Sequence, residues 1–169
     1  HHLRFLPAWR DHLPALVGKV SDPETGEPMT LAFVRLDPRT GYKTCGARAK
    51  TMLLGHKLSG GIVRLAETVE AGGRIGVAEG IETALSIMAS GHGPVWATLG
   101  SNNLAKFPVL REFEEIVVWA DNGFAGERAA EVLAKRWHVA GKSARIILPP
   151  EQHGDWNDVI RNASQEMWR

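Results

Sequence analysis

The sequence predicts an α/β fold in which a mostly parallel central sheet, flanked by helices, follows a small antiparallel β-rich subdomain. Before about residue 50, short alternating runs are separated by turns rich in Pro, Asp and Gly, which is typical of an antiparallel meander. From about residue 58 onward, short apolar runs alternate with segments of helical periodicity, which is typical of parallel strands joined by helices. We therefore assign residues 1–57 to the N-terminal subdomain and residues 58–169 to the main domain.

The N-terminal subdomain is expected to contain three strands. They correspond to "PALVGKV" at 14–20, "MTLAFVRL" at 29–36 and "YKTCGARAK" at 42–50. The segments "SDPETGEP" and "DPRTG" separate them and carry the residues that tight turns prefer.

The main domain is expected to alternate strands with helices. Ile81, Ala84, Leu85 and Met88 recur at helical spacing in "IETALSIMA". We expect the next helix to be interrupted near Pro108. Trp96 and Trp119 lie inside apolar runs, which indicates core positions. The predicted strands are 60–65, 74–79, 93–100, 114–121 and 143–150, and the predicted helices are 81–89, 102–113, 126–141 and 156–162.

Composition limits the possible classes of function. The 169 residues suit one globular domain with or without a small appendage, and a net charge of +1 gives no bulk attraction to nucleic acid. The single cysteine, Cys45, excludes an internal disulfide and a zinc site with several thiolates. No apolar run approaches the ~20 residues of a membrane helix. Because a single cysteine suits a reducing compartment, we expect a cytoplasmic protein. No dinucleotide loop, P-loop, nucleophile elbow or HExxH motif is present.

Acidic side chains follow three of the predicted strands. Glu79 ends "RIGVAE", Asp121 ends "EEIVVWAD", and Asp155 and Asp158 follow "SARIILPP" in "GDWND". Ligands of open α/β sheets bind beyond the carboxyl ends of the strands, so we expect these acids to converge. Like charges that converge repel, and a divalent cation resolves that repulsion. The pattern therefore predicts a metal site.

Each of these acids also has a structural interpretation. Glu79 could stabilise the N-terminus of the helix that follows it. Asp121 could cap the next helix or belong to the turn "ADNG", and Asp155 and Asp158 could cap the last helix. Their joint placement at three strand ends favours the metal site over separate capping roles.

Basic residues gather in the segment that leads into the main domain. Because phosphate contacts come from Lys and Arg, we predict nucleic-acid or nucleotide contacts from Arg48, Lys50, Lys57 and Arg64, with His56 beside them. The alternative is a solvated surface with glycine turns.

Three linked motifs carry a family resemblance over about residues 50–161. "VAEGIETALS", then "VVWADNGFAGERAA", then "GDWND" resemble the Toprim domains of plasmid, phage and mobile-element DNA primases. "KTMLLGHKLSGGIVRL" resembles the basic segment before that core. The resemblance implies that Glu79 acts in proton transfer or as a metal ligand. It also makes Asp121 the first aspartate of a DxD pair, and Asp155 and Asp158 further metal ligands.

The resemblance also implies an activity and partners. Such primases use Mg²⁺ or Mn²⁺ to join ribonucleoside triphosphates on a single-stranded DNA template. They commonly carry a zinc-binding module and work with a replicative helicase, in the same chain or in trans, and we expect no membrane partner. Topoisomerases of the same superfamily need a nucleophilic tyrosine. The single tyrosine, Tyr42, lies in a predicted hairpin, so strand passage is not supported.

The sequence departs from the family pattern at one position. The second aspartate of DxD is replaced by Gly123, which removes one carboxylate and should weaken metal binding. Two alternatives therefore stay open, a metal-dependent nuclease and a non-catalytic nucleic-acid or nucleotide-binding module. If the site is real, Gly123→Asp should strengthen metal binding.

Overall fold

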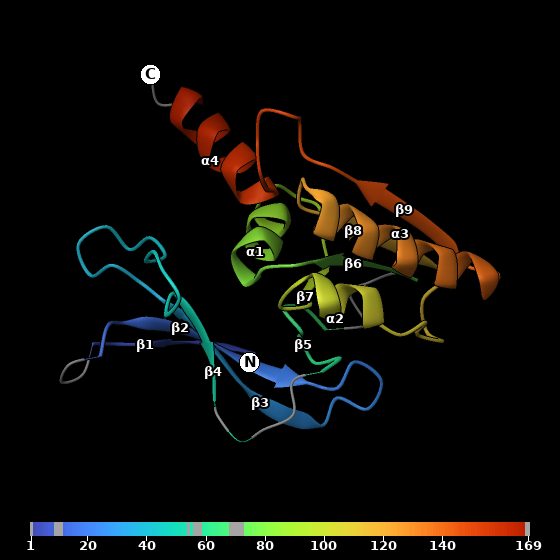
Figure 1. The fold of residues 1–169 in the computed structure, drawn as a ribbon, viewed down its shortest axis with the longest axis horizontal. Coiled ribbons are helices and arrows are strands. Elements are labelled where there is room, and N and C mark those ends of the chain that lie inside the picture. The colour runs from blue at the N-terminus through green and yellow to red at the C-terminus, as the bar shows by residue number, and fades with distance from the viewer. Residues whose placement is uncertain (1, 9–11, 54, 56–58, 68–72, 168–169) are drawn as a thin grey trace.

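The structure is a computed structural model that describes residues 2–8, 12–53, 55, 59–67 and 73–167 (Figure 1). Lys57, His56 and the predicted boundary between residues 57 and 58 lie outside the described residues. The boundary therefore stays a prediction.

The N-terminal part forms antiparallel strands, as the sequence predicts. Strand β1 (Leu3–Leu6) pairs with β2 (Ala15–Ser21), β2 pairs with β3 (Pro28–Arg35), and β3 pairs with β4 (Lys50–Met52). The strand expected over 42–50 is wrong. That segment holds turns and an isolated bridge between Leu36 and Lys43, and β4 begins only at Lys50. Glycines at 41 and 46 with positive φ interrupt the extended conformation there.

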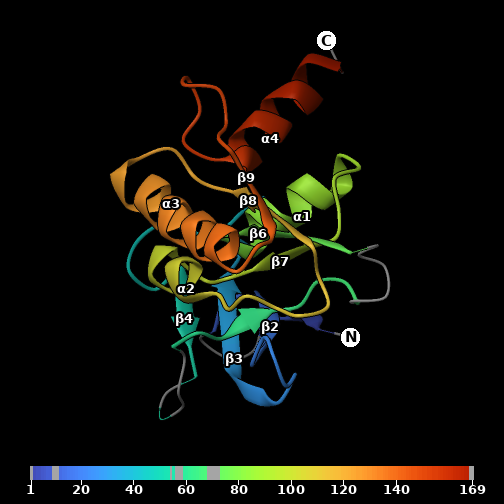
Figure 2. The ribbon, with the colours of Figure 1, turned by 90° about the vertical axis from the view of Figure 1, so that its right-hand side faces the viewer.

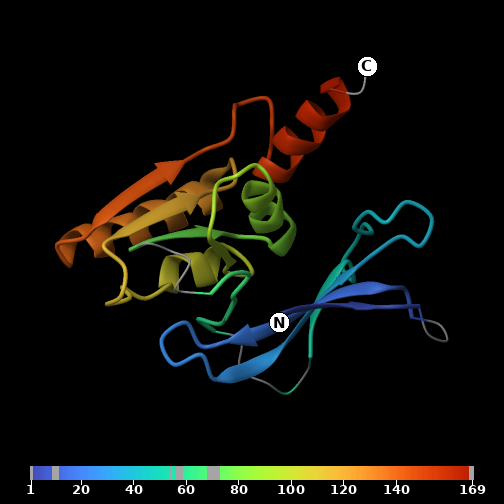
Figure 3. The same ribbon diagram turned by 180° about the vertical axis from the view of Figure 1, so that it is seen from behind.

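One continuous sheet joins this part to the parallel strands. Its order is β4-β3-β2-β5-β7-β6-β8-β9, with β1 at the side of β2. Strands β7, β6, β8 and β9 are parallel, whereas β5 is antiparallel to both β2 and β7. Figure 3 shows the antiparallel strands on one side of β5 and the parallel strands with their helices on the other. The remaining strands are β5 (Ile62–Val63), β6 (Arg74–Ala78), β7 (Val95–Ala97), β8 (Glu115–Trp119) and β9 (Ser143–Ile147).

Helices cover both faces of the parallel strands (Figure 2). Helices α2 (Ser101–Lys106) and α3 (Phe124–Val139) pack together on one face, and α1 (Ile81–Ala89) covers the other, with α4 (Trp156–Met167) against α1. Helix α2 is shorter than predicted. It ends before Phe107, which is extended (φ −54°, ψ 127°) because it precedes Pro108. None of the described helices is both long and apolar enough to cross a bilayer.

Alternation along the strands divides the core between the two faces. Ile75 and Val77 of β6 pack toward α2 and α3, with Leu133 and Trp137 of α3 fully buried against them. Ala78, Val95 and Val117 face α1 and the antiparallel strands. Trp96 and Trp119 are buried, as predicted, at 0% and 8% exposure. The strands are therefore held from both sides, and their carboxyl ends have fixed positions.

The packing of α3 generates a stability prediction. Leu133 is fully buried, whereas Val139 on the same helix is 81% exposed. We expect Leu133→Ala to lower the free energy of unfolding by about 2–5 kcal/mol, since it removes apolar contact and leaves a cavity. Val139→Ala should change it by less than about 0.5 kcal/mol. Urea denaturation of both variants measures the difference, and equal losses would contradict the described packing.

Candidate active site

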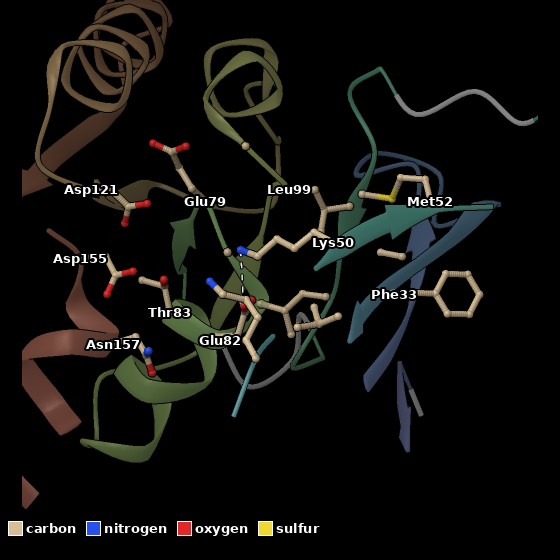
Figure 4. Close-up of a pocket in the computed structure, with 16 residues that line it drawn as sticks. Phe33, Lys50, Met52, Glu79, Glu82, Thr83, Leu99, Asp121, Asp155 and Asn157 are labelled. Atoms are coloured by element: carbon tan, nitrogen blue, oxygen red, sulfur yellow. Dashed lines mark ion pairs between the residues drawn. The ribbon is translucent and has the colours of Figure 1, made fainter. Parts of the chain in front are cut away.

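A pocket lies where β6 and β8 end, between the parallel strands and the antiparallel strands β3 and β4 (Figure 4). Its volume is about 200 Å³. One side is mainly apolar, the opposite side is acidic, and lysines reach in from the antiparallel part. The apolar side is formed by Ala32, Phe33, Val34, Met52 and Leu99, and the acidic side by Glu79, Glu82, Asp121 and Asp155. The two lysines are Lys43 and Lys50.

Three of the four predicted acids line this pocket together. Glu79 directly follows β6, Asp121 follows β8, and Asp155 precedes α4 (Figure 4). Asp158 is not among the lining residues. Its backbone N–H donates to Asp155 Oδ1 at 2.9 Å, so Asp155 caps α4 while it also lines the pocket. The capping interpretation of Asp155 is therefore confirmed, and its role as a metal ligand stays a prediction.

Glycines, not acids, occupy the N-cap positions of α1, α2 and α3. These are Gly80, Gly100 and Gly123, and none of them provides a side-chain cap. Glu79 and Asp121 each lie before the N-cap of the helix that follows. This placement excludes the N-cap interpretation of Asp121 and favours a role in the pocket for both acids.

The Glu79 carboxylate lies beside the first turns of two helices. The Ser101 backbone N–H at the start of α2 acts to lower the pKa of this carboxyl group. At the start of α3, a Cβ placed on Gly126 would lie 2.7 Å from Glu79 Oε1 and 2.7 Å from the Asp121 carbonyl oxygen. Gly126 therefore permits the close approach of α3 to Glu79. This role of Gly126 was not predicted, although the glycine is visible in the motif "DNGFAG".

The surroundings of the Asp121 carboxyl group disfavour its charged form. Burial, together with the nearby Glu79 and Asp155 carboxylates, raises its pKa to about 7, while Lys50 acts in the opposite direction. Burial also raises the pKa of Glu79, against the effects of Lys50 and the Ser101 N–H. Asp121 Oδ1 is buried and has no hydrogen-bond partner among the described residues. A cation would relieve both the repulsion and the missing contact.

Asn122 fixes the loop that carries Asp155. Its side-chain amide donates to the carbonyl of His153 at 2.6 Å and to the carbonyls of Pro149 and Pro150 at 3.3 Å. Its backbone N–H donates to the carbonyl of Gly154 at 2.9 Å. Asp155 is consequently held beside Asp121 by the residue that directly follows Asp121. The spacing of Asn122 and Asp155 along the chain does not predict this contact.

Of the predicted basic residues that the structure describes, Lys50 alone lines the pocket. Arg48 is exposed and lies outside it. The Arg64 guanidinium donates to the carbonyl of Pro23 at 2.7 Å and stacks over the Trp96 ring at 4.7 Å. This geometry favours a structural role for Arg64 over the predicted phosphate contact. Lys43 lines the pocket without having been predicted.

The donor chemistry of the pocket fits a hard divalent cation, and the spacing of its acids limits how many can bind one ion. Carboxylate oxygens are the ligands of Mg²⁺, and Asp121 Oδ1 lacks a partner. Within the described part of the chain, however, no three acidic, histidine or cysteine side chains are spaced to share one ion. Because Mg²⁺ commonly takes one or two carboxylates and keeps several waters, the residues suit an open site better than a closed protein cage.

Gly123 has a backbone conformation that other residues avoid. Its φ of 125° and ψ of 154° lie in a region essentially restricted to glycine. An aspartate at this position, as the family pattern has it, would require the chain to change course before α3. The expectation that Gly123→Asp simply adds a ligand therefore needs correction, because the substitution also strains the backbone.

Comparison with known proteins gives one family and a set of similar structures. The family described as "Toprim domain" matches residues 74–166, and no curated protein matches the chain. The primase fragment of the bacteriophage T7 primase-helicase protein is similar, with a TM-score of 0.65 and 21% identity over 94% of this chain and 63% of that chain. A DNA primase domain from Pseudomonas aeruginosa gives a TM-score of 0.60 and 17% identity over 98% and 55%.

The catalytic domain of DnaG primase, in a structure bound to single-stranded DNA, gives a TM-score of 0.61 and 15% identity over 99% of this chain and 54% of that chain. At these identities the likeness shows a shared fold. The chain spans between 54% and 63% of the length of these three structures.

The raised pKa of Asp121 predicts a pH dependence of stability. Between the ordinary value of 3.8 and about 7, the folded chain holds a proton that the unfolded chain has released. The free energy of unfolding should therefore fall as the pH rises through this window. We expect Asp121→Asn to reduce the fall, and to stabilise the chain more at about pH 8 than at about pH 4. Denaturation with a chelator present tests this, and equal effects at both pH values would contradict it.

The conformation of Gly123 predicts a cost that does not depend on charge. Gly123→Ala and Gly123→Asp should each lower the free energy of unfolding by about 1–3 kcal/mol, since both place a Cβ in the glycine region. Comparing the Mn²⁺ affinities of the two variants by calorimetry then isolates the added carboxylate. We expect tighter binding by Gly123→Asp. Wild-type stability of Gly123→Ala would show that the backbone there is not strained.

Proposed function

The chain belongs to the Toprim domain family, and from this premise we propose that it is the catalytic core of a DNA primase. The proposed reaction is metal-dependent nucleotidyl transfer that makes RNA primers on single-stranded DNA. We place it in the replication of a plasmid, phage or mobile element, because the three sequence motifs resemble those of primases from such elements. Residues 1–57 and 58–169 would be the N-terminal subdomain and the Toprim domain of this core.

One observation carries the proposal. Carboxylates from three separate segments and a lysine from the antiparallel strands surround a single pocket at the carboxyl ends of the parallel strands. The same fold is found in DNA primase domains. A capping role would account for one acid at a time, whereas shared burial beside other acids raises the pKa of Asp121 and costs stability. Functional sites are where such costs are retained.

The roles of the residues follow from their positions. Asp121, Glu79 and Asp155 would supply the carboxylates for Mg²⁺ or Mn²⁺, one or two to each ion, which when bound would stabilise the charge that develops on the transferring phosphoryl group. Asp158 stays a predicted ligand, although it lies outside the pocket lining. Glu79, whose pKa burial raises, is placed to accept the proton of the attacking hydroxyl group. The Lys50 ammonium group would bind phosphate.

The partners follow from the same proposal. The substrates would be a single-stranded DNA template and ribonucleoside triphosphates, and a replicative helicase would act in the same chain or in trans. Two solved relatives support this setting, since one is a fragment of a primase-helicase protein and another is bound to single-stranded DNA.

Gly123 favours a second candidate, a non-catalytic module that binds nucleic acid or nucleotides. The position of the second aspartate carries no carboxylate, and its backbone conformation is essentially restricted to glycine. The backbone at this position therefore requires glycine, so the difference from the family pattern is more than the loss of one carboxylate. Such a module would bind DNA in a salt-dependent way without needing Glu79.

A priming assay separates these functions. The full chain should incorporate ribonucleotides opposite single-stranded DNA with Mg²⁺ or Mn²⁺. Glu79→Gln should lower the rate by about a hundredfold or more, because it removes the proton acceptor and one carboxylate. Glu112→Gln, which removes an exposed acid outside the pocket, should leave the rate unchanged.

Three outcomes would count against the primase proposal. Salt-dependent DNA binding without incorporation, unchanged in Glu79→Gln, would indicate the non-catalytic module. Metal-dependent cleavage of DNA without nucleoside triphosphates would indicate a nuclease. Incorporation that survives Glu79→Gln at the parent rate would place the chemistry elsewhere.

A further inference from the structure

Glu82 joins two lysines of the antiparallel part to the edge of the pocket. Its Oε1 lies 3.4 Å from Lys43 Nζ and 3.3 Å from Lys50 Nζ. Glu82 belongs to the first turn of α1, whereas Lys50 begins β4 and Lys43 lies in the preceding turn segment. Figure 4 shows the Lys50 side chain running from β4 toward Glu82, with Glu79 and Asp121 on the same side. The three charged groups all line the pocket.

The contacts of Glu82 are ion pairs without hydrogen-bond geometry. Both of its carboxylate oxygens are buried, and neither accepts a hydrogen bond from the part of the chain that the structure describes. Its side chain is 20% exposed, while those of Lys43 and Lys50 are 43% and 49% exposed. Each lysine therefore keeps part of its donor capacity open to the pocket. A buried carboxylate of this kind is held mainly by charge, and another anion can compete with it for the same ammonium groups.

An ordinary surface ion pair does not account for this arrangement. Exposed pairs contribute little, whereas here two cations from one part of the fold meet one largely buried anion of another. Here the shared carboxylate sets the distance between the lysines of the antiparallel strands and the acids that follow the parallel strands. Without the Glu82 carboxylate, the two flexible lysine side chains would no longer be held toward the same point.

We infer that Glu82 positions Lys43 and Lys50 to receive the phosphate groups of a ligand in the pocket, and that it competes with those phosphates for the lysines. This inference rests on the proposed function and concerns the same site. The phosphates could belong to a nucleoside triphosphate or to a nucleic-acid strand, and both would meet the same two ammonium groups. Glu82 is thus a positioning residue, while the lysines make the contact.

The inference predicts opposite signs for acid and lysine substitutions. Glu82→Gln should tighten the binding of phosphate ligands by about two- to tenfold, because it removes the competing anion. It should also lower kcat of priming by about ten- to a hundredfold, because the lysines are no longer held in place. Lys43→Met and Lys50→Met should weaken phosphate binding. A merely structural role for Glu82 would instead weaken binding and activity together.

The experiment measures binding separately from catalysis. Fluorescence titrations in chelator use two probes, ATP and single-stranded oligothymidylate, and show which source of phosphate the lysines meet. Glu112→Gln controls for the loss of one negative charge. Lys135→Met, an exposed lysine of α3 outside the pocket, controls for the loss of one positive charge. In the Lys43→Met/Lys50→Met background, Glu82→Gln should no longer change the affinity for the probe that responds.

Each outcome bears on the inference. Tighter binding of either probe by Glu82→Gln, lost in the double-lysine background, supports it. Affinities that match Glu112→Gln, or weaker binding with both probes, overturn it. Thermal unfolding of every variant detects a loss of the fold. A chain that binds the probes with the expected signs but never incorporates ribonucleotides would overturn the primase proposal and leave this inference supported.

Discussion

Repulsion among the acids that follow the parallel strands is the constraint on which the pocket depends. The pairing of β6 with β8 places Ala78 opposite Trp119, so the residues that follow these strands meet. The Asn122 amide holds Asp155 beside them through three carbonyl contacts. The chain thus keeps Asp121 protonated up to about pH 7 when no cation is bound. Stability lost here is offset by the apolar packing of α2 and α3 on the opposite face.

Glycines at the strand-to-helix junctions explain how the acids and the helices share so little space. Gly100 and Gly123 adopt nearly the same conformation, with φ of 125° at both and ψ of 162° and 154°. Gly126 lets the first turn of α3 approach Glu79. The positive ends of α2 and α3 are consequently turned toward this carboxylate, where their partial charge favours its ionised form. The replacement of an aspartate by Gly123 is therefore part of a wider structural pattern.

The alternation of strands and helices, the buried tryptophans and the convergence of Glu79, Asp121 and Asp155 could be predicted from the sequence, because each depends on local periodicity or on the rule that parallel strands end at one edge. The Glu82 ion pairs and the Asn122 contacts could not, since they join residues that are distant in the chain and leave no spacing signal. The short strand β1 gave a weak pattern, whereas β5 lies inside the strand predicted over 60–65. The backbone conformation of Gly123 could not be predicted for a different reason, because a glycine in a sequence does not reveal which conformation it adopts.

Strand β5 has a mechanical consequence for the pocket. It is two residues long, and it is joined to β2 by two residue pairings and to β7 by one. The lysines lie on one side of this narrow seam and the acids on the other. A rotation about the seam would change the gap between opposite charges, and it would also disturb the apolar cluster that packs Val20 and Val34 against Ile81. The aperture of the pocket is therefore a property of the seam and of the Glu82 ion pairs that span it, and belongs to neither half alone.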